Sequence, residues 1–105
     1  MKEFKGTPGP WRFDEHEALS GGPVFYISQD DNAKYTPNYS DVSQTCSGEL
    51  KHIQKANAQL IAEAPNLLKA LIDSLPIWEN MKLDVSEASV LLDCRAAISK
   101  ALGEE

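Results

Sequence analysis

The spacing of hydrophobic residues changes once along this chain, and that change constrains the fold more than any other feature. Apolar and polar side chains alternate in Trp11–Asp14, and Val24–Ser28 is rich in β-branched and aromatic residues. Both patterns are typical of strands. After Gly48 the apolar side chains recur every three or four residues, which is the spacing of one helix face. The chain therefore predicts a sheet-forming front end followed by a helical back end.

The front end, residues 1–36, predicts two or three antiparallel strands. Gly21 and Gly22 lie between the two clear strand patterns and indicate a hairpin loop. Asp30–Asn32 is a turn signal, because short polar side chains bond to their own backbone, and residues 33–36 are a candidate third strand. Residues 37–48 are dominated by short polar residues, and we expect a polar loop there.

The back end, residues 49–102, predicts three helices. Pro65 interrupts the first helical pattern, and a proline is tolerated only in the first turn of a helix. We therefore expect two helices, over residues 49–64 and 65–75, with one kinked helix over 49–75 as the alternative. The second helix should end before Pro76. Its apolar stripe, together with two residues of the first helix, predicts the core: Leu60, Ile61, Leu67, Leu68, Leu71, Ile72 and Leu75.

The last helix is expected over residues 86–102. Asp84 followed three residues later by Glu87 is the pattern of a capping box, and Gly103 is well placed as a stop. Its predicted buried stripe is Val90, Leu91, Cys94, Ala97, Ile98 and Ala101.

Together these elements predict a single α+β domain over residues 1–105. We expect a small two- or three-stranded antiparallel sheet at the N-terminus, packed against three helices. A chain of 105 residues is the length of one domain and can bury one modest core. We expect Trp11 to pack against the helices.

Asn57 is the residue that fits its pattern least well. It lies among the apolar positions of the first helix, on a face that includes Leu50, Ile53 and Leu60. Asparagine is a poor helix former, and a buried amide needs hydrogen-bond partners. We expect Asn57 to be buried and to bond to the backbone of residues 8–11. A polar anchor inside a ligand pocket is the alternative.

The sequence contains no recognisable reactive centre. His16, His52, Cys46 and Cys94 do not have the close ligand pairs of a zinc site, so no metal is expected. The paired carboxylates, Glu15 with Glu17 and Asp30 with Asp31, lie beside turns, where they should be solvated. Acid–base catalysis needs two carboxylates in different environments. No catalytic residue and no cofactor are predicted, and we expect the protein not to be an enzyme.

The charge balance limits the possible partners. The chain has 10 basic and 16 acidic residues, a net charge of −6, and its basic residues do not cluster. Direct binding to nucleic acid needs such a cluster and is not expected. No apolar run approaches the ~20 residues of a membrane span, and no signal peptide is recognisable, so a reducing cytoplasm is the expected compartment.

Three aromatic residues are candidates for a partner-binding surface. Tyr35 and Tyr39 flank the predicted polar loop, and Trp78 follows the expected end of a helix. Exposed tryptophan is enriched at binding hot spots. Short edge strands and any uncovered apolar stripe on the last helix also make a homodimer possible.

Two strings of the sequence resemble a family of small proteins encoded by phages and prophages. They are TPGPW at residues 7–11 and ANAQLIAEAPNLLKAL at residues 56–71, which include Trp11, Asn57 and Pro65. The resemblance implies an accessory protein that works in the cytoplasm of a bacterial host, and it carries over no catalytic residue.

The functional prediction is a non-enzymatic accessory protein that binds a protein of the host or phage, with modulation of host metabolism or defence as its expected role. The alternative is a small-ligand binder, such as a nucleotide-binding protein, that uses a crevice near Asn57.

Overall fold

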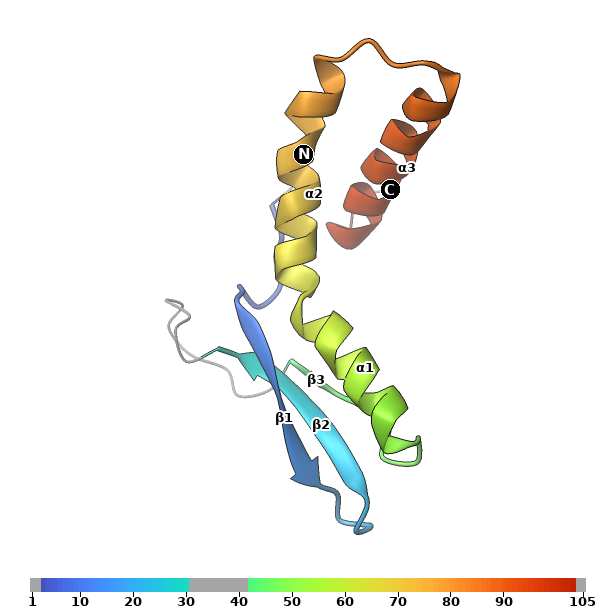
Figure 1. The fold of residues 1–105 in the computed structure, drawn as a ribbon. Helices are drawn as coiled ribbons and strands as arrows, with labels where there is room; N and C mark the ends of the chain where they lie inside the picture. The colour runs from blue at the N-terminus through green and yellow to red at the C-terminus, as the bar shows by residue number, and fades with distance from the viewer. Residues whose placement is uncertain (1–2, 31–41, 104–105) are drawn as a thin grey trace. The chain divides into compact units, whose positions relative to one another are not determined.

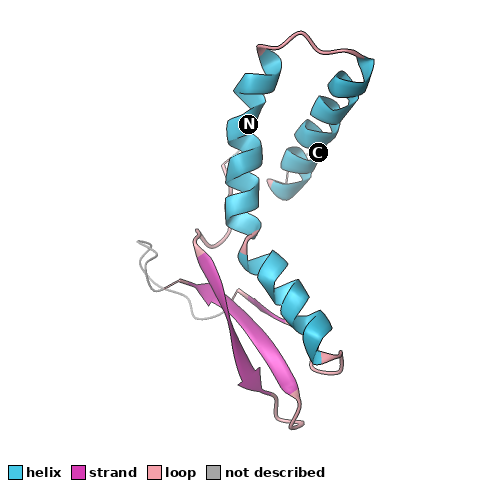
Figure 2. Ribbon diagram, viewed as in Figure 1, coloured by secondary structure: helices cyan, strands magenta, loops and turns pink. Residues whose placement is uncertain are grey.

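The computed structural model describes residues 3–30 and 42–103 (Figure 1). It contains three strands, β1 (Trp11–Glu17), β2 (Pro23–Gln29) and β3 (Ser43–Gln44), and three helices, α1 (Lys51–Ala62), α2 (Ala64–Glu79) and α3 (Val85–Ala101) (Figure 2). The strands form one antiparallel sheet in the order β1-β2-β3. The predicted α+β class, with a small N-terminal sheet and three helices, is confirmed.

The chain divides into two compact units. The first, Thr7–Asn66, holds the sheet and α1 and is called the sheet unit below. The second, Met1–Gly6 with Leu67–Glu105, holds most of α2 and all of α3 and is called the hairpin unit. Each unit has its own hydrophobic cluster, whereas the sequence led us to expect one core around the bend at Pro65. The single domain over residues 1–105 stays a prediction.

The core of the sheet unit lies between the sheet and α1. Phe13 on β1 lies opposite Ile27 on β2 in the strand register, and the Phe13 and Phe25 ring centroids are 6.1 Å apart. Helix α1 contributes the fully buried Ala58. The whole cluster consists of Phe25, Ile27 and Ala58, with the half-buried Trp11, Phe13, Val42 and Ile61 packed against them.

The third strand lies inside the segment predicted as a polar loop. Gln44 pairs with Tyr26, and the Thr45 amide donates to the Phe25 carbonyl at 2.9 Å. The prediction of a loop was wrong at residues 43–44, because two polar residues are too few to show a strand pattern. The candidate strand at residues 33–36 lies outside the described residues.

Two helices, not one kinked helix, occupy residues 51–79. Helix α1 ends at Ala62, Glu63 is its C-cap, and α2 begins at Ala64, which places Pro65 in the first turn as predicted. The predicted end of the second helix before Pro76 was wrong, since α2 runs through Pro76 to Glu79. Proline removes one backbone donor. The apolar contacts of Leu75 and Trp78 with the hairpin cluster offset that loss.

The hairpin unit has a small core between α2 and α3. Its buried residues are Leu75, Leu91, Ile98 and Leu102, with the half-buried Leu68, Leu71, Ile72, Trp78 and Leu83 packed around them. The predicted stripe of α3 is confirmed at Leu91 and Ile98, but Val90, Ala97 and Ala101 are exposed.

The N-terminus of α3 has the predicted capping box. The Glu87 amide donates to Asp84 Oδ1 at 2.8 Å, and the Asp84 amide donates to Glu87 Oε1 at 3.2 Å. At the other end Gly103 has a φ of 75°, a left-handed conformation that glycine adopts without strain.

We expect Asp84→Ala to lower the free energy of unfolding by about 1 kcal/mol, because it removes the side-chain acceptor of the cap. Chemical denaturation of the full chain measures the change. Ser86→Ala is the matched control, since Ser86 is an exposed residue of the same turn outside the capping box. A loss that is equal in the two variants would contradict the role of the cap.

Candidate functional site

The two sequence strings meet in the sheet unit, at Gly9 and Pro65. A Cβ placed on Gly9 would lie 2.7 Å from Pro65 Cβ and 3.1 Å from Pro65 Cγ. Separations under 3.0 Å are too short for two carbon atoms, so only glycine fits here without movement. This contact joins the TPGPW string to the helical string within the sheet unit.

Hydrogen bonds hold the first string on the sheet. Trp11 Nε1 donates to the Thr7 carbonyl at 3.0 Å, and Gln29 Nε2 donates to the Pro8 carbonyl at 3.5 Å. The Asp30 amide donates to the Pro10 carbonyl at 2.9 Å. Residues 7–10 are thus tied to the start of β1 and the end of β2, which sets the position of Gly9 against Pro65.

The buried amide of this unit belongs to Gln54, not to Asn57. Gln54 is fully buried, and its Nε2 donates to the carbonyls of Pro23, at 2.9 Å, and Glu49, at 2.8 Å. Its Oε1 accepts from Thr45 Oγ1 at 2.7 Å, and Thr45 Oγ1 in turn accepts from the Phe25 amide at 3.0 Å. One side chain therefore links α1 to the start of β2, to Thr45 just after β3 and to Glu49 just before the helix.

The prediction that Asn57 is buried was wrong, because α1 faces the sheet with the opposite side. The buried residues of α1 are Gln54, Ala58 and Ala62. The sheet presents the large rings of Phe13 and Phe25 to this helix, so only small side chains leave room for close packing. Asn57 lies on the exposed face of α1.

Two of the larger apolar residues of α1, together with Leu50 at its N-cap, consequently face solvent, whereas Ile61 packs against the core. Leu50 is 61% exposed, Ile53 36% and Leu60 64%. With Asn57 they follow spacings of three, four and three residues and lie along one side of the helix. We call Leu50, Ile53, Asn57 and Leu60 the α1 stripe.

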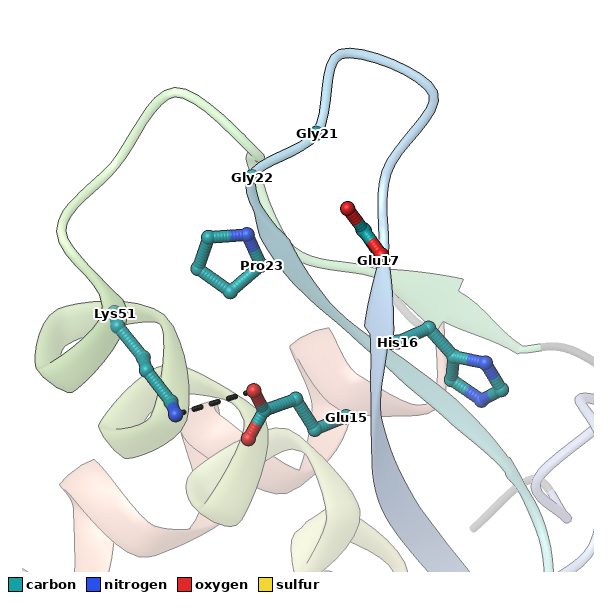
Figure 3. Close-up of a pocket in the computed structure, with 7 residues that line it drawn as sticks. All are labelled: Glu15, His16, Glu17, Gly21, Gly22, Pro23 and Lys51. Atoms are coloured by element: carbon teal, nitrogen blue, oxygen red, sulfur yellow. Dashed lines mark ion pairs between the residues drawn. The ribbon is translucent and has the colours of Figure 1, made fainter.

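An open depression of about 490 Å³ lies at the other end of the sheet unit (Figure 3). Glu15 Oε2 lies 3.1 Å from Lys51 Nζ across it, while His16 points to the opposite side of β1 (Figure 3). The His16 ring packs edge-on against Tyr26, with centroids 4.8 Å apart. Both partners of the ion pair are about half exposed, so the two charges remain solvated. Chemically, this depression offers one solvated ion pair.

The two cysteines lie in different units. Cys46 is exposed and Cys94 half-buried, and both are free thiols. Within residues 3–30 and 42–103, no three His, Cys, Asp or Glu side chains are placed to hold a metal ion. In the same residues, no helix is long and apolar enough to span a membrane. Asp31 lies outside the described residues.

The three aromatic candidates for partner binding have different outcomes. Tyr35 and Tyr39 lie outside the described residues. Trp78 is half-buried and packs against the hairpin cluster, so part of its ring serves the core. Sequence reasoning missed the α1 stripe because it took this face of the first helix to be the buried one, with Asn57 and Leu60 inside.

The fold and site define a small α+β protein in which one helix covers a sheet and two others form a hairpin. The chain belongs to the family described as Salmonella phage P22 protein Y8K6, whose family model matches residues 1–105. This is a family of phage proteins, in agreement with the resemblance noted in the sequence. No curated protein and no solved structure matches the chain.

Proposed function

We propose that this protein is a non-enzymatic phage accessory protein that binds a protein of the host or phage through the α1 stripe, in the cytoplasm of the bacterial host. The exposure of Leu50 and Leu60, at 61% and 64%, carries the proposal. Burying leucine stabilises a complex by roughly 1.5–3 kcal/mol per side chain relative to leaving it in water. A role in host metabolism or defence would follow from the identity of the partner.

The stripe has the anchor spacing of a helix that lies in an apolar groove. Such complexes use side chains at intervals of three and four residues along one helix face. His52 and Lys55 are exposed, but at one and two positions from Ile53 they point to other sides of the helix, so the stripe itself carries no charge. Asn57 near the middle would then bond to a polar group of the partner and fix the register.

The alternative function, binding of a small ligand near Asn57, depended on a buried amide. Since Asn57 is exposed, no specific observation favours that alternative.

The test is capture of partners from phage-infected cells with tagged protein, followed by mass spectrometry of proteins and small molecules. We expect one stoichiometric protein partner with the unmodified chain, and at least about tenfold less of it with Leu60→Glu, because a charge enters the apolar contact.

Leu19→Glu is the matched control, since Leu19 is also an exposed leucine of the sheet unit but lies in the β1–β2 loop. It should capture the same amount of partner as the unmodified chain. Retention of a metabolite without a protein partner would contradict the proposal, as would equal capture by Leu60→Glu and the unmodified chain.

A further inference from the structure

The hairpin unit also leaves apolar side chains uncovered, and these belong to both of its helices. On α2 they are Leu67, 54% exposed, and Ile77, 66% exposed, with Ala70 and the half-buried Ser74 between them. On α3 they are Val90, 47% exposed, Ala97 and Ala101, with the half-buried Cys94 between them. We call these residues the hairpin face: Leu67, Ala70, Ser74, Ile77, Val90, Cys94, Ala97 and Ala101.

The two rows lie on the same edge of the hairpin. Arg95 Nη2 is 2.9 Å from Glu79 Oε1, so these two residues mark one edge shared by both helices. At about 100° per residue, Leu67 and Ser74 lie about a quarter turn from Leu75, on the side away from Glu79, and Ala70 and Ile77 lie further round in the same direction. In the same way Leu91 lies between Arg95 and the α3 row. Since Leu75 and Leu91 both point into the core, both rows lie at the edge opposite the ion pair.

The spacing along the two rows is that of a helical bundle. Residues 67, 70, 74 and 77 are separated by three, four and three positions, and residues 90, 94, 97 and 101 by four, three and four. Alternating intervals of three and four are typical of helices packed nearly parallel or antiparallel in a bundle. In an isolated hairpin, one such row on each helix packs against the other helix. In this unit the core residues already form that row, so the hairpin face is a second row on each helix.

The hairpin face is suited to burial. Its one hydroxyl, Ser74 Oγ, donates to the Leu71 carbonyl at 2.6 Å, so burying it leaves no unpaired donor. The face contains no charged residue, and the nearby Lys69 and Asp73 pair with each other. Lys69 Nζ lies 2.6 Å from Asp73 Oδ2, and this hydrogen bond raises the pKa of Lys69. The centres of protein–protein interfaces contain few charged residues.

From these observations we infer that the hairpin face binds the same face of a second copy of this chain, so that two hairpins form a four-helix bundle. This goes beyond the proposed function, because it concerns another unit and another partner. A second copy fits because the face combines large side chains on α2 with alanines on α3, and a twofold axis can place one against the other. The four buried residues of one hairpin make a small core, which a second hairpin would double.

The test is sedimentation of the full untagged chain over a range of concentrations. We expect a mass of twice the 11.6 kDa chain, falling to one chain on dilution. Ile77→Glu should raise the dissociation constant of the dimer about a hundredfold, because it places charge in an apolar interface. Ala97→Glu should do the same from the other helix, and circular dichroism shows whether each variant keeps its helices.

Leu92→Glu is the matched control. Leu92 is 63% exposed on α3, on the Arg95 side of the helix, and its substitution should leave the dimer intact. A chain that is monomeric at every concentration from micromolar upward would overturn the inference. So would a dimer that survives both face substitutions, or one that only Leu92→Glu or Leu60→Glu dissociates.

Discussion

Gln54→Ala is expected to lower the free energy of unfolding of the sheet unit by about 3 kcal/mol. The substitution leaves the Pro23 and Glu49 carbonyls without their donor and Thr45 Oγ1 without its acceptor. Each buried polar group left unpaired costs about 1–3 kcal/mol. Because whole domains are stable by about 5–15 kcal/mol, this change should shift a denaturation curve visibly.

Two variants show whether the hydrogen bonds are responsible. Asn57→Ala alters an exposed amide three residues away and should leave stability unchanged or raise it by up to about 0.5 kcal/mol. Gln54→Met keeps most of the side-chain volume but makes none of the three bonds, and it should recover only part of the loss. If Gln54→Met is as stable as the unmodified chain, the network does not have the role assigned to it.

Gly9→Ala is expected to destabilise the protein by about 1–3 kcal/mol, because the added Cβ would overlap Pro65 and one of the two segments would have to move. Thermal or chemical unfolding measures the loss. Gly22→Ala is the matched control, since a Cβ there meets only the Ser47 carbonyl at 3.6 Å, which is an ordinary contact. It should cause no comparable loss.

The partner of Gly9 can be identified by a double-mutant cycle with Pro65→Gly. Removing the Pro65 side chain opens the space that a Cβ on residue 9 needs, so Gly9→Ala should cost less in the Pro65→Gly background. Additive losses would show that the two strings of the sequence do not meet in this way.

The sequence predicts most helices and strands of this fold, because interactions between neighbouring residues determine where they form. The strands at β1 and β2 follow from alternation and β-branched residues, and the α3 cap follows from the spacing of Asp84 and Glu87. The helix break at Pro65 follows from the missing backbone donor. These features depend on a few neighbouring residues, so the sequence contains them directly.

The orientation of α1 could not be predicted in the same way. Its large apolar residues suggested the buried face, but Phe13 and Phe25 fill the space above the sheet and favour Ala58 and Ala62 there. Hydrophobic residues are common on surfaces, so their spacing alone does not decide which face is buried. Gln54, five positions after Glu49, gave a weak signal because glutamine is ordinary in helices. The candidate site was missed for the same reason.

The central claim is that α1 packs on the sheet with Ala58 and Ala62 and presents Leu60 to solvent. The most direct measurement is the rate at which a thiol reagent labels Leu60→Cys and Ala58→Cys in the native protein, each in a Cys46→Ser background, with mass spectrometry to locate the label. Leu60 is 64% exposed and Ala58 fully buried. The label should therefore enter quickly at position 60 and only slowly at position 58, with the protein otherwise folded. Fast labelling at position 58 and protection at position 60 would contradict this orientation of α1, and with it the proposed binding surface.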